Sequence, residues 1–493
     1  MDSPPHSVRV TTARVARPLV DPLTAYLALG ARFGRDQVYL LESAGGPPGD
    51  CGQHVVGFAE RLSISVTAGE VQVRGADAVR AAVLARVEPL LTADGTRLRD
   101  NRGLWALIRA AESVFEVTGS ATGFEFGFLA YFGYDVARYI EDLPHLIESD
   151  PGVPDVHLVL YQGLLRTDLV TGDAELLVHT SPAWPDLDLG ELSDLLAAAA
   201  DRPADPGADA PSADEVIEDD TARETYLRHV DKALGHIAIG DIYQVQLGHE
   251  LSIRSDSDPV RVYRRLRERN ASPYMYLTPL GEHTVVGASP ELFVRVRDGE
   301  VVMRPIAGTH PRGVVDGEPV DDEVAAAALA SSPKEIAEHV MLVDLCRNDI
   351  GRICGKDTLE VREQMVVERY SHVLHLVSTV VGRAAPGTDS YDVIAALFPS
   401  GTMTGAPKIR AMEIIEATEA RRRGLYAGAI GLIGAGGYLN LALCIRTLIH
   451  SGGVYRTRAS AGVVADSDAG REWTETLAKS SAAYWAVTGR ELL

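Results

Sequence analysis

Apolar and polar residues alternate along much of this chain, and the period changes repeatedly between that of strands and that of helices. In the first part, residues 37–43 (QVYLLES) and 66–75 predict strands, and residues 78–87 predict a helix. Residues 123–139 predict a strand, a turn and the start of a helix. No repeat of solenoid length is present in the sequence. The pattern therefore predicts a mixture of strands and helices along the chain.

A stronger pattern follows in the second part of the chain. We expect a helix from Thr221 and a short strand over residues 240–245. Residues 284–296 and 301–306 predict strands that pair around the Asp-Gly turn at 298–299.

The last part combines hairpins with long helices. Residues 427–464 predict β-hairpins with glycine turns at 435–437 and 451–453. Residues 333–350 and 471–487 predict helices. The apolar stripe of the first of these helices consists of Ile336, Val340, Val343 and either Leu345 or Ile350.

A glycine- and threonine-rich loop lies between these elements. Residues 398–415 (FPSGTMTGAPKIRAMEII) predict a strand end, this loop and a helix with an apolar face. Its glycines allow close approach to a ligand, and Pro407 suits the first helical turn. Free N–H groups at a helix N-terminus attract anions, so the loop is a candidate site for a carboxylate or a phosphate. The alternative is an ordinary capped helix. The P-loop pattern is absent from this segment.

One segment has the composition of a linker. Residues 201–215 (DRPADPGADAPSADE) are rich in aspartate, proline and alanine. We therefore predict an N-terminal region over residues 1–200 and a catalytic region over residues 216–493.

Length and charge limit the chemistry. The chain has 493 residues, of which 46% are hydrophobic, and a formal net charge of -22. Large cores are therefore expected, whereas nucleic acid and anionic membrane surfaces are excluded as partners. An anionic substrate would need local cations or a metal ion.

The sequence predicts a cytoplasmic protein. Its first ten residues have no apolar core of signal-peptide type. The most apolar run, residues 427–445, is interrupted by glycines and by Asn440. Reduced thiols are expected because the cysteines have no C-x-x-C spacing, at Cys51, Cys346, Cys354 and Cys444.

Paired glutamates form a candidate metal site. Glu335 and Glu338 are three residues apart on one predicted helix, and Glu472 and Glu475 are three apart on another. Each pair shares a helix face. If both pairs faced one pocket, their oxygens would suit Mg²⁺. The alternative is that these glutamates form solvated helix faces.

Single residues of catalytic type also occur. His375 lies in an apolar strand and is either a proton carrier or a core residue. Arg446 follows a buried-looking strand and would bind a carboxylate, either of a ligand or of an aspartate within the protein. Glu291 lies between a turn and a strand and is either a general acid or an exposed carboxylate.

Several segments in order resemble the chorismate-utilising enzymes, most closely the large subunit (component I) of anthranilate synthase. The segments are GASPE, PIAGT, SSPKEIAEHVMLVDLCRNDIGRI, RYSHVLHLVS, GTMTGAPKIRAMEII, CIRT and DSDAGREWTETLAKS. The resemblance is strong from about Gly240 to the last helix and weaker over residues 1–200. It implies an α+β fold in which large antiparallel sheets pack in a sandwich with helices outside.

The resemblance also implies a Mg²⁺-dependent site for chorismate. Glu338 and Glu475 would bind the ion directly, and Glu335 and Glu472 would act through waters. The ring carboxylate would lie near Gly308, Thr309, Thr402 and Lys479, and the enolpyruvyl carboxylate near Tyr426, Arg446 and Gly462.

Two residues with catalytic roles follow from the same resemblance. Glu291 would protonate the hydroxyl that leaves C4 while a nucleophile adds at C2. His375 would assist a later loss of pyruvate.

Two positions indicate the nucleophile. Relatives that add water are similar in carrying a lysine base where this chain has Gln244, and an amide cannot take that proton. Relatives that make 4-amino-4-deoxychorismate resemble one another in a covalent lysine where this chain has Ala307. Ammonia addition at C2 is therefore expected, which argues against an isochorismate, salicylate or 4-amino-4-deoxychorismate synthase.

The predicted product is 2-amino-2-deoxyisochorismate (2-amino-4-deoxychorismate), as released by relatives in secondary metabolism such as antibiotic biosynthesis. The chain departs from the usual anthranilate synthase pattern at Ser460, where glycine is common, and at Asn440, Ala478 and Ser480. Ser460 would lie beside the enolpyruvyl group. One alternative is a full anthranilate synthase component I, which also eliminates pyruvate. The non-enzyme alternative is a catalytically silent regulatory or binding homologue.

The remaining expectations concern the partners of the protein and its regulation. Ammonia would come from solution or from a glutamine amidotransferase subunit, within a homo- or hetero-oligomer. A candidate tryptophan site resembles that of the family in its residues Glu42, Ser43, Asn270, Pro273, Tyr274 and Met275. The alternative is a pair of packed strands without a ligand.

Overall fold

The computed structural model describes residues 7–47, 49–118, 123–148, 152–201, 216–315, 318–370 and 373–493. Within these ranges no helix has the length and apolarity needed to span a membrane. The helices are α1 Pro22–Phe33, α2 Asp77–Val87, α3 Leu104–Glu112, α4 Leu189–Ala200, α5 Arg223–Ala238, α6 Pro259–Arg269, α7 Asp322–Ser331, α8 Pro333–Gly351, α9 Ser390–Leu397, α10 Lys408–Glu416 and α11 Ala469–Thr488.

Strands make up most of the interior. The first are β1 Val8–Arg17, β2 Val38–Glu42, β3 Gln53–Thr67, β4 Glu70–Gly75, β5 Phe115–Val117, β6 Gly127–Phe132, β7 Val156–Asp168 and β8 Ala174–Thr180. The others are β9 Val216–Asp219, β10 Gln244–Arg254, β11 Tyr274–Leu280, β12 His283–Ser289, β13 Leu292–Arg297, β14 Glu300–Met303, β15 Ile306–Pro311, β16 Gly313–Val315, β17 Glu318–Val320, β18 Glu360–Arg369, β19 Val373–Arg383, β20 Gly405–Ala406, β21 Ala429–Gly434, β22 Leu439–Leu443, β23 Thr447–Ser451 and β24 Val454–Val463.

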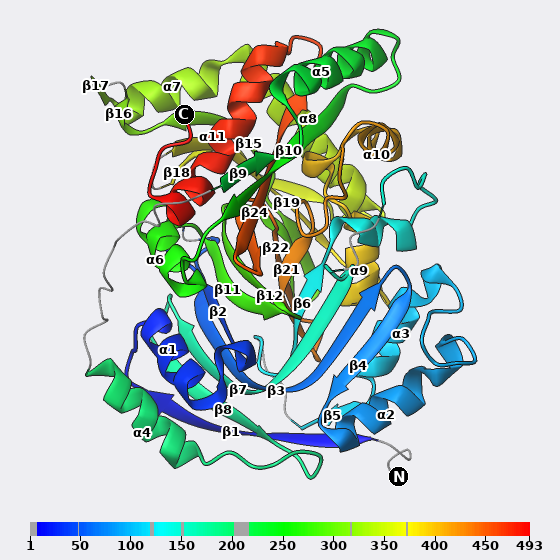
Figure 1. Cartoon of the computed structure of the whole chain (residues 1–493), viewed down its shortest axis with the longest axis vertical. Coiled ribbons are helices and arrows are strands. Elements are labelled where there is room, and N and C mark those ends of the chain that lie inside the picture. Colours follow the sequence, from blue (N-terminus) through cyan, green and yellow to red (C-terminus); the bar gives the residue numbers. More distant parts are fainter. Residues whose placement is uncertain are drawn as a thin grey trace.

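The predicted α+β architecture is confirmed. Antiparallel pairing continues from β10 through β24, β23, β12, β11, β2, β3, β7, β6, β21, β22, β13 and β14 to β19. The strands form the interior and the helices lie along the outside, with α5 and α11 over one end (Figure 1). Long strands therefore bring distant parts of the sequence to one place.

Strands from the two halves of the chain pair directly. In β2 and β11, Leu40 lies opposite Leu277, and in β6 and β21, Ala130 lies opposite Gly431. The predicted boundary between two regions stays a prediction, because residues 202–215 of the proposed linker lie outside the described ranges.

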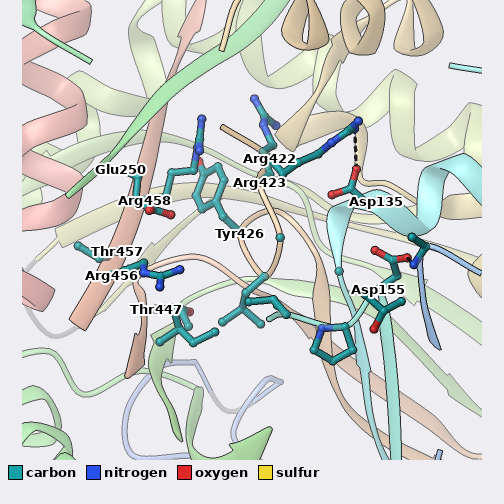
Figure 2. A pocket seen from close by; sticks show the side chains of 18 residues that line it. Asp135, Asp155, Glu250, Arg422, Arg423, Tyr426, Thr447, Arg456, Thr457 and Arg458 are labelled. Atoms are coloured by element: carbon teal, nitrogen blue, oxygen red, sulfur yellow. Dashed lines mark hydrogen bonds and ion pairs between the residues drawn. The ribbon is translucent and has the colours of Figure 1, made fainter. Parts of the chain in front are cut away.

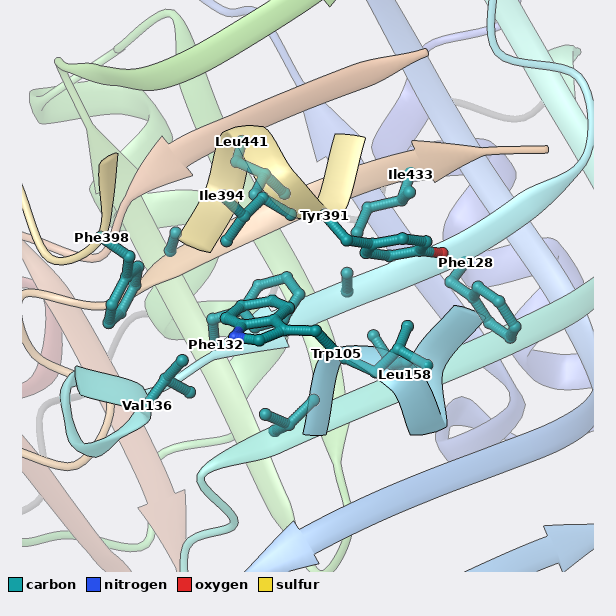
Figure 3. Close-up of a cluster of buried hydrophobic side chains, with 14 of the residues drawn as sticks. Trp105, Phe128, Phe132, Val136, Leu158, Tyr391, Ile394, Phe398, Ile433 and Leu441 are labelled. Carbon is teal, nitrogen blue, oxygen red and sulfur yellow. The ribbon is translucent and has the colours of Figure 1, made fainter. Parts of the chain in front are cut away.

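One core joins the halves just below the glycine/threonine loop. Trp105 of α3 packs against the fully buried Phe132 of β6, with ring centroids 6.1 Å apart. Ile394 of α9 and Leu441 of β22 belong to the same cluster (Figure 3). Burial of such side chains contributes about 1.5–3 kcal/mol each. This core fixes α9 and therefore the loop that follows it.

Capping residues define where the two glutamate-bearing helices begin. The Ser332 side chain accepts a hydrogen bond from the N–H of Glu335 at the start of α8. The Asp468 side chain accepts one from the N–H of Arg471 at the start of α11. Glu335 and Glu472 thus lie in first helical turns, where the helix dipole favours negative charge.

The segment before the glycine/threonine loop is a helix, and the predicted strand end is wrong. α9 ends at Leu397, a 3-10 turn spans Gly401–Met403, and Pro407 is the N-cap residue of α10. A short apolar run that is buried on several sides has no clear period, so strand and helix cannot be separated by pattern. The N–H groups of Met403 and Thr404 bond to carbonyls within the loop.

Three smaller predictions are corrected. The strand expected over residues 284–296 is broken at Pro290-Glu291, between β12 and β13. Of the short strand expected at 240–245, only residues 244–245 are strand, at the beginning of the longer β10, and residues 240–243 lie in the connection from α5. Val340 is 42% exposed and does not belong to the buried stripe of α8, which keeps the predicted Val343 and Ile350 and adds Leu342 and Cys346. All four cysteines are free thiols, as predicted.

Replacing Phe132 tests the joint core. Phe132→Ala should destabilise the protein by about 3–5 kcal/mol, because it leaves a cavity between the two halves. Urea unfolding followed by fluorescence measures the change. The matched control is Leu19→Ala, whose side chain is 60% exposed, and its effect should stay within about 0.5 kcal/mol. Equal effects of the two substitutions would contradict this packing.

Candidate active site

One cavity gathers most of the residues that the sequence singled out. It lies where β10, β15, β19 and β24 meet α8, α11 and the glycine/threonine loop. Its walls include Gln244, Glu291, Gly308, Glu338, His375, Thr402, Tyr426, Arg446, Ser460, Glu475 and Lys479. Because these residues come from distant parts of the chain, the strand pairing creates this site.

Four candidates lie beside the cavity and not in its wall: Thr309, Gly462, Glu335 and Glu472. Only the backbone of Thr309 is described, and it pairs with His375. A Cβ placed on Gly462 would lie 2.8 Å from the Gln244 amide nitrogen and 3.0 Å from that of Gln246, so a side chain there would displace these amides. The functional roles of all these residues stay predictions.

Glu291 has the environment of a general acid. It lies in the break between β12 and β13, and the Thr402 hydroxyl donates to its Oε1 at 3.1 Å. Burial raises the pKa of Glu291 to about 7, although Thr402 and the nearby cations oppose the shift. At neutral pH this carboxyl is therefore protonated about half of the time and can supply a proton.

His375 is held as a neutral ring. Its Nδ1 lies 2.8 Å from the carbonyl oxygen of Gly308, which can only accept, so Nδ1 carries the hydrogen. Burial lowers the pKa of His375 to about 4. Nε2 of this neutral tautomer is a proton acceptor. Gly308 has φ 62°, and a Cβ there would lie 2.7 Å from Leu329.

Arg446 is a buried cation without an anionic partner among the described residues. It lies between β22 and β23 with φ 49°. Burial lowers its pKa, while the charge of Glu291 opposes this effect. Within the described ranges, no hydrogen bond or ion pair engages its guanidinium. The aspartate partner that was the structural alternative is therefore absent from the described residues, and a ligand carboxylate would fit.

A hydrogen-bonded row crosses the wall formed by β10 and β24. The hydroxyl groups of Tyr426 and Ser460 lie 2.5 Å apart. Ser460 also donates to the Gln246 amide oxygen at 3.0 Å, and Lys479 donates to the Ser460 carbonyl at 3.0 Å. Burial alone would lower the pKa of Lys479, but the Glu475 carboxylate, 2.7 Å away, keeps that pKa raised.

Gln244 presents an unsatisfied amide. Its side chain is buried, and Oε1 has no hydrogen-bond partner among the described residues. Buried polar atoms in proteins are rarely left unpaired, so a ligand donor is expected at this point of the cavity.

The glutamates can supply oxygen ligands, but they are not gathered into a tight group. Burial raises the pKa of Glu338, and the charges of Glu335 and Glu475 raise it further. Burial and Glu475 likewise raise the pKa of Glu472. No cluster of three or more potential ligands is close enough to hold a metal among the described residues. The mutual repulsion and the purely carboxylate donor set nevertheless fit Mg²⁺, which takes few carboxylates directly.

A second pocket lies behind Tyr426. It shares Tyr426 and Arg458 with the cavity, and its other walls carry Asp135, Asp155, Glu250 and several arginines (Figure 2). Tyr426 and Arg458 therefore line both polar pockets.

Sequence reasoning missed a buried ion network that supports these walls. Glu419 accepts hydrogen bonds from Arg458 at 2.8 Å and from the N–H of Gly248 at 3.0 Å. Arg423 bonds to Glu419 and to the carbonyl of Gln246. No local pattern marks these residues. Gln246, in contrast, was recognisable, because the i, i+2 spacing on a strand places it on the same face as Gln244.

The candidate tryptophan residues lie around another pocket. Glu42, Ser43, Pro273, Tyr274 and Met275 line it, whereas Asn270 does not. The Glu42 carboxylate already accepts from the Tyr263 hydroxyl at 2.7 Å and from Arg267. Tryptophan binding there stays a prediction.

Comparisons with known proteins agree with the resemblance. The chorismate binding enzyme family matches residues 68–484. The chain is 61% identical to a 2-amino-4-deoxychorismate synthase of Streptomyces globisporus over 99% of this chain and 98% of that protein. It is 36% identical to anthranilate synthase component 1 of Acinetobacter calcoaceticus, over 92% and 90%. The structure of anthranilate synthase component I from Streptococcus pneumoniae has a TM-score of 0.70 at 30% identity, covering 88% and 92%.

Titration of Glu291 tests the electrostatics of the cavity. Its carboxyl should ionise with a midpoint of about 7, whereas a glutamate in water ionises near about 4.3. Thr402→Val should raise the midpoint further, because it removes a hydrogen bond to the ionised form. Isotope-edited infrared spectroscopy reads the carboxylate band directly. Thr171→Val, at an exposed loop, serves as the control, and a downward shift in Thr402→Val would contradict the geometry.

Proposed function

This chain belongs to the family of chorismate binding enzymes, and we propose that it aminates chorismate at C2 with loss of the C4 hydroxyl. The product is 2-amino-4-deoxychorismate, also called 2-amino-2-deoxyisochorismate. The observation that carries this proposal is the 61% identity, along nearly the whole chain, to a synthase of that product. The cavity supplies the residue types that the reaction needs.

Glu291 donates the proton that the leaving hydroxyl requires. Ammonia nitrogen forms a bond to C2, the two ring double bonds shift, and the C4–O bond breaks as water forms. Nitrogen then loses one proton, so the reaction consumes ammonia and releases water. A carboxyl with a pKa of about 7 carries the needed proton at neutral pH.

Gln244 is suited to ammonia and not to activation of water. Its free amide oxygen can accept a hydrogen bond from an N–H of ammonia. An amide cannot remove a proton from water, and Ala307 in the same wall has no nucleophilic group.

The two carboxylates of chorismate meet different partners. Arg446, with Tyr426 and Gly462, faces the enolpyruvyl carboxylate. Gly308, Thr309, Thr402 and Lys479 lie on the side of the ring carboxylate. Glu338 and Glu475 would hold Mg²⁺, with Glu335 and Glu472 acting through waters, and the ion would supply positive charge for the ring carboxylate.

Formation of anthranilate is the second candidate. The neutral His375, with Nε2 as a proton acceptor, favours it, because loss of pyruvate needs a base near the ring.

Ammonia comes from solution or from a separate glutamine amidotransferase subunit, and the enzyme acts in the cytoplasm.

Product identification tests the reaction. Chorismate, Mg²⁺ and ammonium should give a product in which the mass of one OH group is replaced by that of one NH₂ group. Mass spectrometry and an assay for pyruvate measure it. Omitting ammonium is the control and should prevent the reaction. A product without nitrogen would refute the proposal, and stoichiometric pyruvate would favour anthranilate formation.

Metal dependence tests the glutamates. Chelation should abolish turnover, and Glu338→Gln or Glu475→Gln should weaken Mg²⁺ binding by at least about tenfold. Calorimetric titration of Mg²⁺ measures affinity independently of turnover. Glu224→Gln, in the exposed first turn of α5, is the matched control. Unchanged Mg²⁺ affinity in both cavity variants would rule out this ligand set.

A further inference from the structure

Ser460 belongs to the cavity wall and pairs with Gly248 across β24 and β10. A Cβ placed on Gly248 would lie 2.3 Å from the Ala459 carbonyl oxygen and 2.9 Å from the Ser460 Cβ, so the backbone of β24 already requires glycine there. The serine side chain lies beside this glycine, and its hydroxyl is directed between Tyr426 and Gln246.

The hydrogens in this row can be counted. The Gln246 amide oxygen only accepts, so the single hydroxyl hydrogen of Ser460 goes to Gln246. The short contact between Ser460 and Tyr426 needs a hydrogen as well, and only the Tyr426 hydroxyl can supply it. The one hydrogen of Tyr426 is therefore committed to Ser460, and the phenol oxygen offers only lone pairs to the cavity.

Because the Tyr426 hydrogen is bonded to Ser460, a substrate carboxylate finds one hydrogen-bond donor fewer in the cavity. Arg446 and Tyr426 line the same cavity as Ser460. Arg446 is the cation that attracts the enolpyruvyl carboxylate, but the Tyr426 oxygen cannot donate to it while Ser460 holds its hydrogen. Of the three residues assigned to the enolpyruvyl carboxylate, Arg446 and Gly462 remain, and the Tyr426 hydroxyl gives it no hydrogen bond.

We propose that Ser460 is a positioning residue that determines specificity: by taking the hydrogen of Tyr426, it leaves the enolpyruvyl group loosely held and lets the amine depart intact. This inference rests on the proposed function. It identifies the residue that separates amination from the later loss of pyruvate.

Loss of pyruvate depends on the placement of that group. The C2–H bond breaks, its electron pair forms the C2=C3 double bond, and the C3–O bond breaks. The ether oxygen becomes the ketone of pyruvate as a proton adds to the enolpyruvyl methylene carbon. One proton leaves C2 and one reaches the methylene, so no oxidant is needed. Both transfers require a fixed enolpyruvyl group.

The test is the ratio of pyruvate to aminated product with chorismate, Mg²⁺ and ammonium. Ser460→Ala keeps the Cβ but removes the acceptor, which frees the Tyr426 hydrogen for the substrate. The ratio should rise by at least about tenfold, and the KM for chorismate should fall by about tenfold, as expected for a hydrogen bond gained to a charged group.

A second variant should also free the Tyr426 hydrogen while Ser460 itself is unchanged. Gln246→Met removes the amide acceptor, so Ser460 can donate to Tyr426 and the tyrosine hydrogen is released. The ratio should rise again. This variant keeps the test decisive if Ser460→Ala does not fold.

Two controls test whether a change in the ratio comes from the freed Tyr426 hydrogen or from the space that the smaller side chain leaves. Adding Tyr426→Phe to Ser460→Ala should return the ratio to that of the unsubstituted chain, because no hydrogen remains to donate. Ser65→Ala, which removes a strand serine hydrogen bond to His157 far along the chain, should leave the ratio unchanged.

The outcomes are distinct. An unchanged ratio in both Ser460→Ala and Gln246→Met, or a rise that persists in the double variant, overturns the role of Ser460. Failure of the unsubstituted chain to aminate chorismate refutes the proposed function instead, and with it the premise of this inference.

Discussion

Burial in a single cavity shifts the pKa of three groups that face it, Glu291, His375 and Arg446. Burial raises the pKa of the Glu291 carboxyl to about 7 and lowers that of His375 to about 4. It also disfavours the charge on Arg446, which nevertheless stays cationic because the guanidinium is so basic. Burial therefore favours the neutral forms of Glu291 and His375, while Arg446 stays a cation against the same effect.

The buried arginines are of two kinds: Arg423 and Arg458 support the structure, whereas Arg446 is available to bind a ligand. Arg423 and Arg458 share the buried Glu419, and each also donates to at least one backbone carbonyl. That network ties the glycine/threonine loop to β10 and β24. Arg446 has no such partner in the described part of the chain. Since an unpaired buried charge is costly, its cost is offset only when an anion binds.

Specificity in such a site depends on single hydrogens. Gln244 and Gln246 lie on one face of β10, yet one offers a free acceptor and the other has its acceptor occupied by Ser460. On the proposed role of Ser460, amination with and without loss of pyruvate is separated by the direction of the Tyr426 hydroxyl hydrogen. Hydrogen bonds in a dry cavity are strong enough for this to matter.

The sequence by itself determined the element types, the family and most members of the site. Long periodic helices such as α8 and α11 and glycine turns such as that before β24 are encoded locally, so they were predictable. The short helix α9, the break at Glu291 and the exposure of Val340 were not, because packing against other elements decides them. Tertiary structure alone decided the protonation of Glu291, the isolation of Arg446 and the direction of the Tyr426 hydroxyl. Each depends on neighbours hundreds of residues away, and on how much water those neighbours exclude.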